Sequence, residues 1–268
     1  MEMESGEMKM KVKGKNWKNR IAPYIGVAIL GILWFAVCEA GVFNAYVLPS
    51  PGKVFQSFWK MLLSGELFVD IAISFGRVFK GFVIAFLLAF ALGMFRMLIP
   101  ASEKYFDLIV QFFRNVPPLS MIPLLILWCG IGETTKIVII ILASFFPMYM
   151  NIVKGFTSCD KSLLEVGDVF GYNGFEKFTK IILPNAFADI LVGMRIGMGY
   201  SWRAIIGAEM VAASTGLGHL ILFSQQMSRT DKVIVGIFAI GFVGLFMDKI
   251  FGIIIQKVFK RTGENERN

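Results

Sequence analysis

The sequence predicts an all-α protein that lies in a membrane as a bundle of about six helices. Of its 268 residues, 56% are hydrophobic and only 17% are charged, and the mean hydropathy is +0.67. A soluble domain usually carries about 25% charged residues, so this chain has too few to cover a surface in water. The composition also excludes disorder, which requires low hydrophobicity and high charge.

Six apolar segments account for the predicted spans, because a helix crosses the hydrocarbon core in about 20 residues. The first is expected to be a retained helix and not a signal peptide, because it begins only at Ile21 and is followed by Glu39 instead of a small-residue cleavage site. The third contains Pro117, Pro118 and Pro123, which predict a kink that could act in gating or only in packing. The six segments are residues 21–38, 71–98, 115–132, 137–153, 186–213 and 233–247.

A short amphipathic helix is predicted between the first two spans. Ser50 is a suitable N-cap, and Pro51 suits the first helical position. The apolar residues that follow recur on one face, which is typical of a helix in the outer membrane interface. This face could also pack against the bundle, and the two contacts could coexist. Its members are Val54, Phe55, Phe58, Trp59, Leu62 and Leu63.

Lysine and arginine residues decide the orientation, because cationic loops remain on the cytoplasmic side of a membrane. With the N-terminus inside, the inner segments hold sixteen of these residues and the outer segments five. We therefore expect a plasma-membrane protein with a cytoplasmic basic segment at 1–20, one membrane domain at 21–256 and a cytoplasmic tail at 257–268. The net charge of +8 then marks cytoplasmic loops, and no nucleic-acid partner is expected.

The cytoplasmic loop 154–185 is predicted to form two short helices. Ser162 and Glu165 have the spacing of a capping box, which satisfies free backbone donors at a helix start, and Gly171 is expected to end that helix. The second helix is expected to stop near residue 182, because Pro184 disfavours helical backbone at the residue before it. The first helix is apolar on two sides, which predicts a docked partner on the side that the bundle leaves open.

A longer pattern runs through this loop. Glu165-Val166-Gly167 is followed after three residues by Gly171, and after nine more by Ile181-Ile182-Leu183-Pro184. The pattern resembles the EAA motif of ABC-importer permeases, with Val166 and Gly167 at the two alanine positions. Other segments resemble the nitrate/sulfonate/taurine branch of these permeases, and together they extend the resemblance over residues 47–261. These segments are 47–51, 125–133, 193–197 and 208–218.

The resemblance implies a type I ABC-importer permease fold and a non-catalytic subunit. Two copies would form the path for a small, anionic solute such as a sulfonate, taurine or nitrate. An extracytoplasmic binding protein would deliver the solute. Cytoplasmic ATPase subunits would bind the ATP, because this chain has no phosphate-binding loop, and no cofactor is expected in the chain itself. The loop residues that match the motif would dock on the ATPase, with Glu165 acting in coupling as well as in helix capping.

Three residues of the fifth span are candidates for the solute path. Ionisable residues within a membrane normally face the bundle interior or water, which singles out Arg203 and Glu209, and Trp202 is next to Arg203. Arg203 could form an ion pair between helices or line the path, where its charge would favour an anion. Arg195, nearer the cytoplasmic end, is expected to extend toward the membrane interface.

Enzyme and metal-binding functions find no support in the sequence. It contains no G-x-S-x-G, H-E-x-x-H or phosphate-loop motif, its three cysteines form no CxxC pair, and His219 is its one histidine. The alternative to an ATP-driven importer is an ATP-independent secondary transporter or a channel. Either could have six spans, but neither would account for the two-helix cytoplasmic loop.

Overall fold

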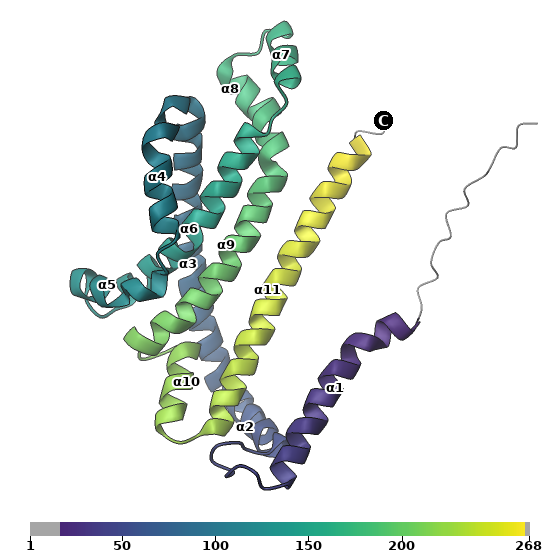
Figure 1. Ribbon diagram of the computed structural model, residues 1–268, viewed down its shortest axis with the longest axis vertical. Coiled ribbons are helices and arrows are strands. Elements are labelled where there is room, and N and C mark those ends of the chain that lie inside the picture. Colours follow the sequence, from purple (N-terminus) through teal and green to yellow (C-terminus); the bar gives the residue numbers. More distant parts are fainter. Residues whose placement is uncertain (1–16, 266–268) are drawn as a thin grey trace, which may run out of the picture.

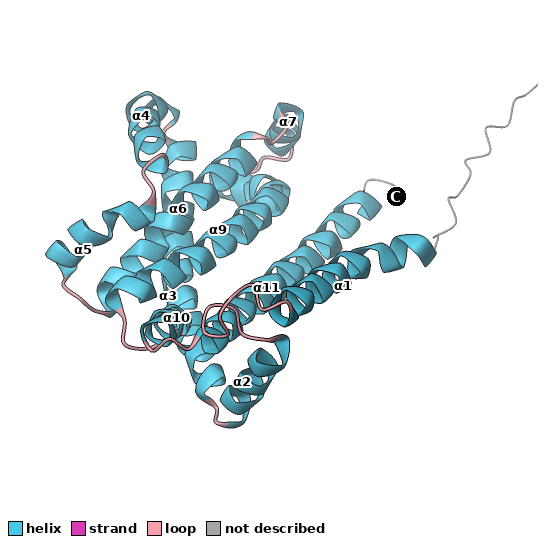
Figure 2. Ribbon diagram, turned by 60° about the horizontal axis from the view of Figure 1, so that its bottom comes forward, coloured by secondary structure: helices cyan, strands magenta, loops and turns pink. Residues whose placement is uncertain are grey.

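The computed structural model describes the backbone of residues 17–265 and the side chains of residues 25–257. Residues 1–16 of the predicted basic segment and residues 266–268 of the predicted tail therefore lie outside the described residues, and of residues 258–265 only the backbone is described. The part of the chain that the structure describes consists of helices joined by short loops and contains no strand (Figures 1 and 2). The all-α prediction is confirmed.

Within the described part of the chain, four helices are long and apolar enough to cross a membrane. They are α3 (Glu66–Leu98), α6 (Glu133–Thr157), α11 (Thr230–Asn265) and a continuous helix, Gly174–Ala212, that contains α9 (Leu183–Ala212). Glycines let α3 and α6 approach closely, as small residues do between membrane helices. A Cβ atom built on Gly81 would lie only 2.6 Å from Ile140 Cγ2. Helices α3, α6 and α9 thus form the packed centre of the bundle.

The third predicted span has the kink expected at its prolines, but its predicted bounds, 115–132, are wrong. The chain instead forms α4 (Glu103–Arg114) and α5 (Ile122–Cys129), and the segments containing these helices are bent by 85° at the break. Pro117 and Pro118 lie at this break and cannot donate the backbone hydrogen bonds that a continuous helix needs. Together the two pieces have the length and composition of a broken span or of a re-entrant loop. Helix α5 projects sideways from the bundle (Figures 1 and 2).

Helices α1 (Trp17–Glu39) and α2 (Pro51–Leu63) lie at the edge of the bundle. The predicted start of α2 is confirmed, since Ser50 Oγ accepts a hydrogen bond from the N–H of Lys53 at 3.4 Å. Val54 faces the core, as do Ser57 and Met61, whereas the rest of the predicted apolar face stays exposed. Helix α2 therefore packs against the bundle and keeps an apolar side available to lipid.

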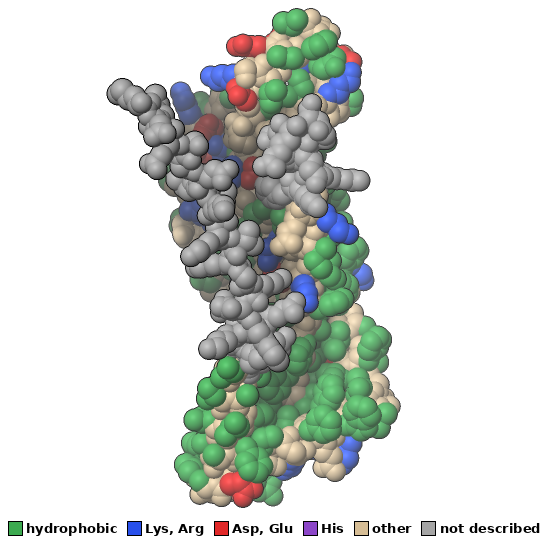
Figure 3. Space-filling model, turned by 90° about the vertical axis from the view of Figure 1, so that its right-hand side faces the viewer, with side chains coloured by type: hydrophobic (Ala, Val, Ile, Leu, Met, Phe, Trp, Pro, Cys, Tyr) green, Lys and Arg blue, Asp and Glu red, His purple; other side chains and the backbone are tan. Residues whose placement is uncertain are grey.

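The short helix α7 (Lys161–Val169) lies at one end of the molecule (Figure 1). The end of α11 and the beginning of α1 are directed toward this end, and the beginning of α1 stops well short of α7 (Figure 1). At the opposite end, α10 (Leu217–Gln226) packs on α3, α9 and α11. Figure 3 shows charged side chains gathered at the α7 end and mostly hydrophobic ones over the opposite half of that face.

Candidate functional site

Helix α7 projects from the end of α6 (Figure 1). Its N-cap is Asp160, whose carboxylate accepts a hydrogen bond from the backbone N–H of Ser162 at 3.0 Å, and this bond lowers the pKa of Asp160. The predicted capping box of Ser162 and Glu165 is therefore wrong, because Ser162 already lies inside the helix. Gly171 follows the last turn with a φ of +71°, the left-handed conformation expected of a glycine that ends a helix.

The second loop helix, α8 (Gly174–Lys177), begins with the capping box that was expected in α7. The side chain of Asn173 accepts from the N–H of Glu176 at 2.9 Å, and the Glu176 carboxylate accepts from the N–H of Asn173 at 3.0 Å. The predicted helix end near residue 182 is wrong. A π-helical turn, Phe178–Ile182, leads directly into α9, and this wider turn makes room for the ring of Pro184 in the first turn of α9.

Three of the predicted loop residues attach α7 to the rest of the protein. Gly167 is buried, and a Cβ atom there would lie 2.8 Å from Ile181 Cδ1. This contact explains why glycine replaces one alanine of the resembled motif. Leu183 packs against the hydrophobic core, and an ion pair between Lys177 and Asp168 adds a further tie between the two loop helices.

The opposite side of α7 is exposed and largely apolar. Glu165 points outward, and Val166 is 49% exposed, Val169 88% and Phe170 70%. Removing these apolar side chains from water is favourable by about 25 cal/mol for each Å² of apolar surface that becomes buried. An apolar patch on a projecting, charged end of the protein is typical of an interaction surface.

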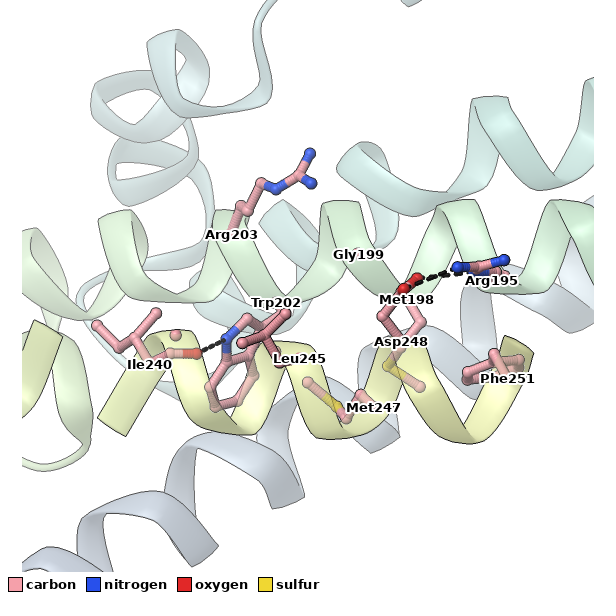
Figure 4. Close-up of a pocket in the computed structure, with 12 residues that line it drawn as sticks. Arg195, Met198, Gly199, Trp202, Arg203, Ile240, Leu245, Met247, Asp248 and Phe251 are labelled. Atoms are coloured by element: carbon pink, nitrogen blue, oxygen red, sulfur yellow. Dashed lines mark hydrogen bonds and ion pairs between the residues drawn. The ribbon is translucent and has the colours of Figure 1, made fainter. Parts of the chain in front are cut away.

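A cavity of about 390 Å³ lies between α9 and α11 (Figure 4). Trp202 lines it and donates from Nε1 to the carbonyl of Ile240 at 3.0 Å. Arg203 lies at its rim with the guanidinium pointing away from α11 (Figure 4), 5.7 Å from the ring centroid of Tyr200. Among the described residues Arg203 has no carboxylate partner, so the interhelix ion pair considered for it is not found there.

At one end of this cavity Arg195 forms two hydrogen bonds with Asp248 of α11, each 2.7 Å long. The expectation that Arg195 simply extends toward the interface is therefore incomplete. Both oxygens of the carboxylate are engaged by the planar fork of the guanidinium, which is the geometry that arginine favours. The pair ties α9 to α11 and leaves little net charge at that end.

The structure does not bring Glu209 together with Trp202 and Arg203 in the cavity. Glu209 is completely buried and accepts hydrogen bonds from Arg77 Nη1 at 2.8 Å, from Ser74 Oγ at 2.8 and 2.9 Å, and from the N–H of Gly218 at 3.0 Å. A buried carboxylate needs such donors, because an uncompensated charge in the interior is very costly.

Arg77 also binds Glu133 with bonds of 2.8 and 2.7 Å, and Lys136 Nζ lies 2.6 Å from the same carboxylate. We call Arg77, Glu133, Lys136 and Glu209 the buried charge cluster, although Glu133 is partly open to solvent. It joins α3, α6 and α9. Sequence reasoning missed its first three members, yet an arginine within an apolar span is itself a signal that a carboxylate must lie nearby.

Three successive backbone N–H groups hold the start of α10 against Glu209 of the cluster and two neighbouring residues of α3. Gly216 donates to Asp70 Oδ1 at 2.9 Å, Leu217 to Ser74 Oγ at 2.9 Å, and Gly218 to Glu209. These are donors that a helix cannot satisfy internally at its N-terminus. Side chains from α3 and α9 therefore fix α10 at the end of the molecule opposite α7.

Comparison with known proteins places this helical membrane bundle among transport permeases. Residues 81–260 match the model of the family described as the binding-protein-dependent transport system inner membrane component. A putative aliphatic sulfonates transport permease protein of Bacillus subtilis is 35% identical over 87% of this chain and 84% of that protein. The taurine transport system permease protein of Escherichia coli is 30% identical over 83% of this chain and 82% of that protein. The nitrate import permease protein of Synechocystis is 28% identical over 87% of each.

Solved structures share the fold. An inward-facing methionine ABC transporter aligns with a TM-score of 0.59 over 75% of this chain and 97% of that chain, at 19% identity. An amino acid ABC transporter aligns with a TM-score of 0.62 over 75% of this chain and 98% of that chain, at 16% identity. The chain thus belongs to the family of binding-protein-dependent transport system inner membrane components, the ABC-importer permeases, and to their sulfonate/nitrate/taurine branch.

Proposed function

We propose that two copies of this permease form the solute path of an ATP-driven importer in the plasma membrane. Cytoplasmic ATPase subunits supply the energy, and an extracytoplasmic binding protein delivers a small anionic solute. The chain itself is a non-catalytic subunit. Relatives in the same family are named for aliphatic sulfonates, taurine and nitrate, and each of these solutes carries an anionic group.

The observation that carries the proposal is the geometry of α7 and α8. One side of α7 is fitted to the protein through Gly167 and Ile181, and the other side exposes Glu165, Val166 and Phe170 to the outside of the bundle. A short turn, residues 170–173, separates α7 from α8, but Gly167 of α7 packs on Ile181 of the π turn. Because that π turn continues directly into α9, a force on α7 reaches a membrane-crossing helix through this contact. In this arrangement ATPase closure moves α9 through α7 and α8.

In the solute path, Trp202 and Arg203 face the solute, and the charge of Arg203 attracts the anion. Glu209 contributes by holding the outer end of α9 against α3 and α10. The end of α11 lies toward α7, and α1 and α11 both have their terminal ends directed toward the α7 end of the molecule (Figure 1). This supports an orientation in which both termini face the cytoplasm with the ATPase.

Replacement of Glu165 by alanine tests the coupling role. The tagged chain is purified from membranes that also contain the ATPase subunit, and the amounts of both proteins are measured. Loss of a charged hydrogen-bonding group from the interface should weaken docking by about tenfold or more, with unchanged abundance of the permease in the membrane. Glu39→Ala is the matched control, because Glu39 is exposed at the end of α1 far from α7 (Figure 1). Normal docking and normal transport in Glu165→Ala would refute the coupling role.

A further inference from the structure

The broken pair α4 and α5 is covered by very little of its own chain. Between residues 103 and 129, only Ile122 and Leu125 are buried. On α5 and the turn after it, Leu127 is 80% exposed, Trp128 67% and Ile131 78%. Because α5 projects sideways from the bundle (Figures 1 and 2), this apolar surface lies outside the packed core of its own copy.

The face from which α5 projects carries charge deep in the membrane. Arg114 ends α4 about 17 Å from the start of that helix, which is roughly half of a hydrocarbon core of about 30 Å. Arg114 is exposed, as is Arg203 of α9, whose guanidinium points away from α11 (Figure 4). Neither arginine has a carboxylate partner among the described residues. Charged side chains at this depth normally face protein or water and not lipid.

A hollow of about 330 Å³ joins these features into one surface. It is lined by the end of α4, by the break after it, by α6 and by α9, and its polar residues include Asn151 and Tyr200. The guanidinium of Arg203 lies 5.7 Å from the ring centroid of Tyr200. One turn further along α9, a Cβ atom built on Gly207 would lie 2.8 Å from Leu119 Cδ2, so the chain that leads into α5 packs directly on α9.

Lipid is a poor cover for this surface. Irregular backbone occurs at membrane depth only where protein or water covers it, and the break contains Pro117 and Pro118, which have no N–H to donate. The outer side of α11 is different, because Leu245 and Phe246 are exposed there and residues 233–247 carry no charge. Helix α11 therefore presents a surface suited to lipid, and the surface around α5 needs another cover.

We infer that the face formed by α4, α5, α6 and α9 is the contact between two copies of this chain, and that α5 is the arm by which each copy holds the other. The inference rests on the proposed function and deepens it by naming the surface at which the two copies meet. Water alone would leave the apolar side chains of α5 exposed, and lipid alone would leave the arginines without water. A second copy meets both needs.

The symmetry of a pair completes the arrangement. A twofold axis brings the same surface of both copies together, so each α5 lies across the α6 and α9 face of its partner. The apolar side chains of the arm then contact protein. Arg114 and Arg203 face the water-filled space that the two copies enclose.

Counting fluorescently tagged copies by single-molecule photobleaching in phosphatidylcholine vesicles tests the contact without the ATPase. The full-length chain should form dimers that dissociate as it is diluted in lipid. The double variant Leu127→Ala, Trp128→Ala should raise the dissociation constant about tenfold or more, as expected when large side chains are removed from the centre of an interface. Both side chains lie outside the core, so the variant should keep its fold.

The matched control is Leu245→Ala, Phe246→Ala, which removes two adjacent side chains of similar size and exposure from α11. It should leave the dissociation constant unchanged. An equal loss in both double variants would show general association of apolar helices and would overturn the assigned contact.

Brominated phosphatidylcholine distinguishes an arm covered by protein from an arm in lipid, because bromine on an acyl chain quenches the fluorescence of a tryptophan that it touches. The signal of Trp128 is the difference between the unmodified chain and Trp128→Phe. This signal should resist quenching in the dimer and be quenched when the chain is diluted to monomers. Quenching at both densities would place α5 in lipid and overturn the inference.

A chain that stays monomeric at every density, or a dimer that the arm variant does not weaken, also overturns the inference. A dimer held by another surface that still imports solute with ATP, its ATPase and its binding protein would leave the proposed function standing. A dimer held by α5 that shows no ATP-driven uptake would contradict the proposed function and leave the contact standing.

Discussion

Replacing Arg77 with methionine should destabilise the protein by about 3–5 kcal/mol, the usual cost of removing one partner from a buried ion pair. Arg77 is only 7% exposed, and Glu209, which it binds at 2.8 Å, is completely buried. Without the guanidinium, the carboxylate keeps only its bonds from Ser74 and Gly218.

Most of this loss should come from the pair with Glu209. The other partner of Arg77, Glu133, has a side chain that is 59% exposed, and solvent-screened pairs contribute only about 0–1 kcal/mol. A double-mutant cycle with Glu209→Gln separates the two contributions. The double variant should lose less than the sum of the single variants, because it leaves no unpaired buried charge.

The assay is chemical denaturation of the purified chain in detergent, followed by tryptophan fluorescence. Arg114→Met is the control, since Arg114 is exposed and has no carboxylate partner among the described residues. A change below about 1 kcal/mol in Arg77→Met, equal to that in the control, would refute the idea that the buried charge cluster stabilises the bundle.

Three further substitutions have expected effects. Gly81→Val should destabilise the bundle by about 1–3 kcal/mol in the same denaturation assay, because a built Cβ lies 2.6 Å from Ile140; full stability would contradict the close packing of α3 and α6. Asn173→Ala should cost about 1 kcal/mol by removing the N-cap of α8, seen as faster amide exchange in the loop, and unchanged exchange would argue against the cap. Arg195→Met should cost at most about 1 kcal/mol of stability, because the side chains of both Arg195 and Asp248 are more than a third exposed. A larger loss would contradict the exposure of this pair.

Features set by neighbouring residues could be predicted from the sequence. The start of α2 depends on Ser50 and Pro51, and the end of α7 depends on Gly171, and each of these signals acts within one helical turn. The exposed outer side of α7 was also foreseen from its apolar pattern. These local features located the loop that carries the proposed coupling role.

Features set by distant residues could not be predicted. Arg77 and Glu209 are 132 positions apart, and no spacing rule joins side chains across two helices whose packing is unknown. Two local features were also predicted wrongly. The capping position of Asp160 was missed because two residues that can act as N-caps, Asp160 and Ser162, are only two positions apart. The continuous helix through Pro184 was not predicted because proline usually ends a helix. Here the wider π turn before it leaves space for the proline ring.

Uptake by proteoliposomes tests the proposed function most directly. The permease is reconstituted with its ATPase subunit and its binding protein, and labelled alkanesulfonate entering the vesicles is measured with and without ATP. Uptake is expected only with ATP and should fall in Glu165→Ala but not in Glu39→Ala. Equal uptake without ATP, driven by an ion gradient or by the solute gradient alone, would identify a secondary transporter or a channel and contradict the coupling role of α7 and α8.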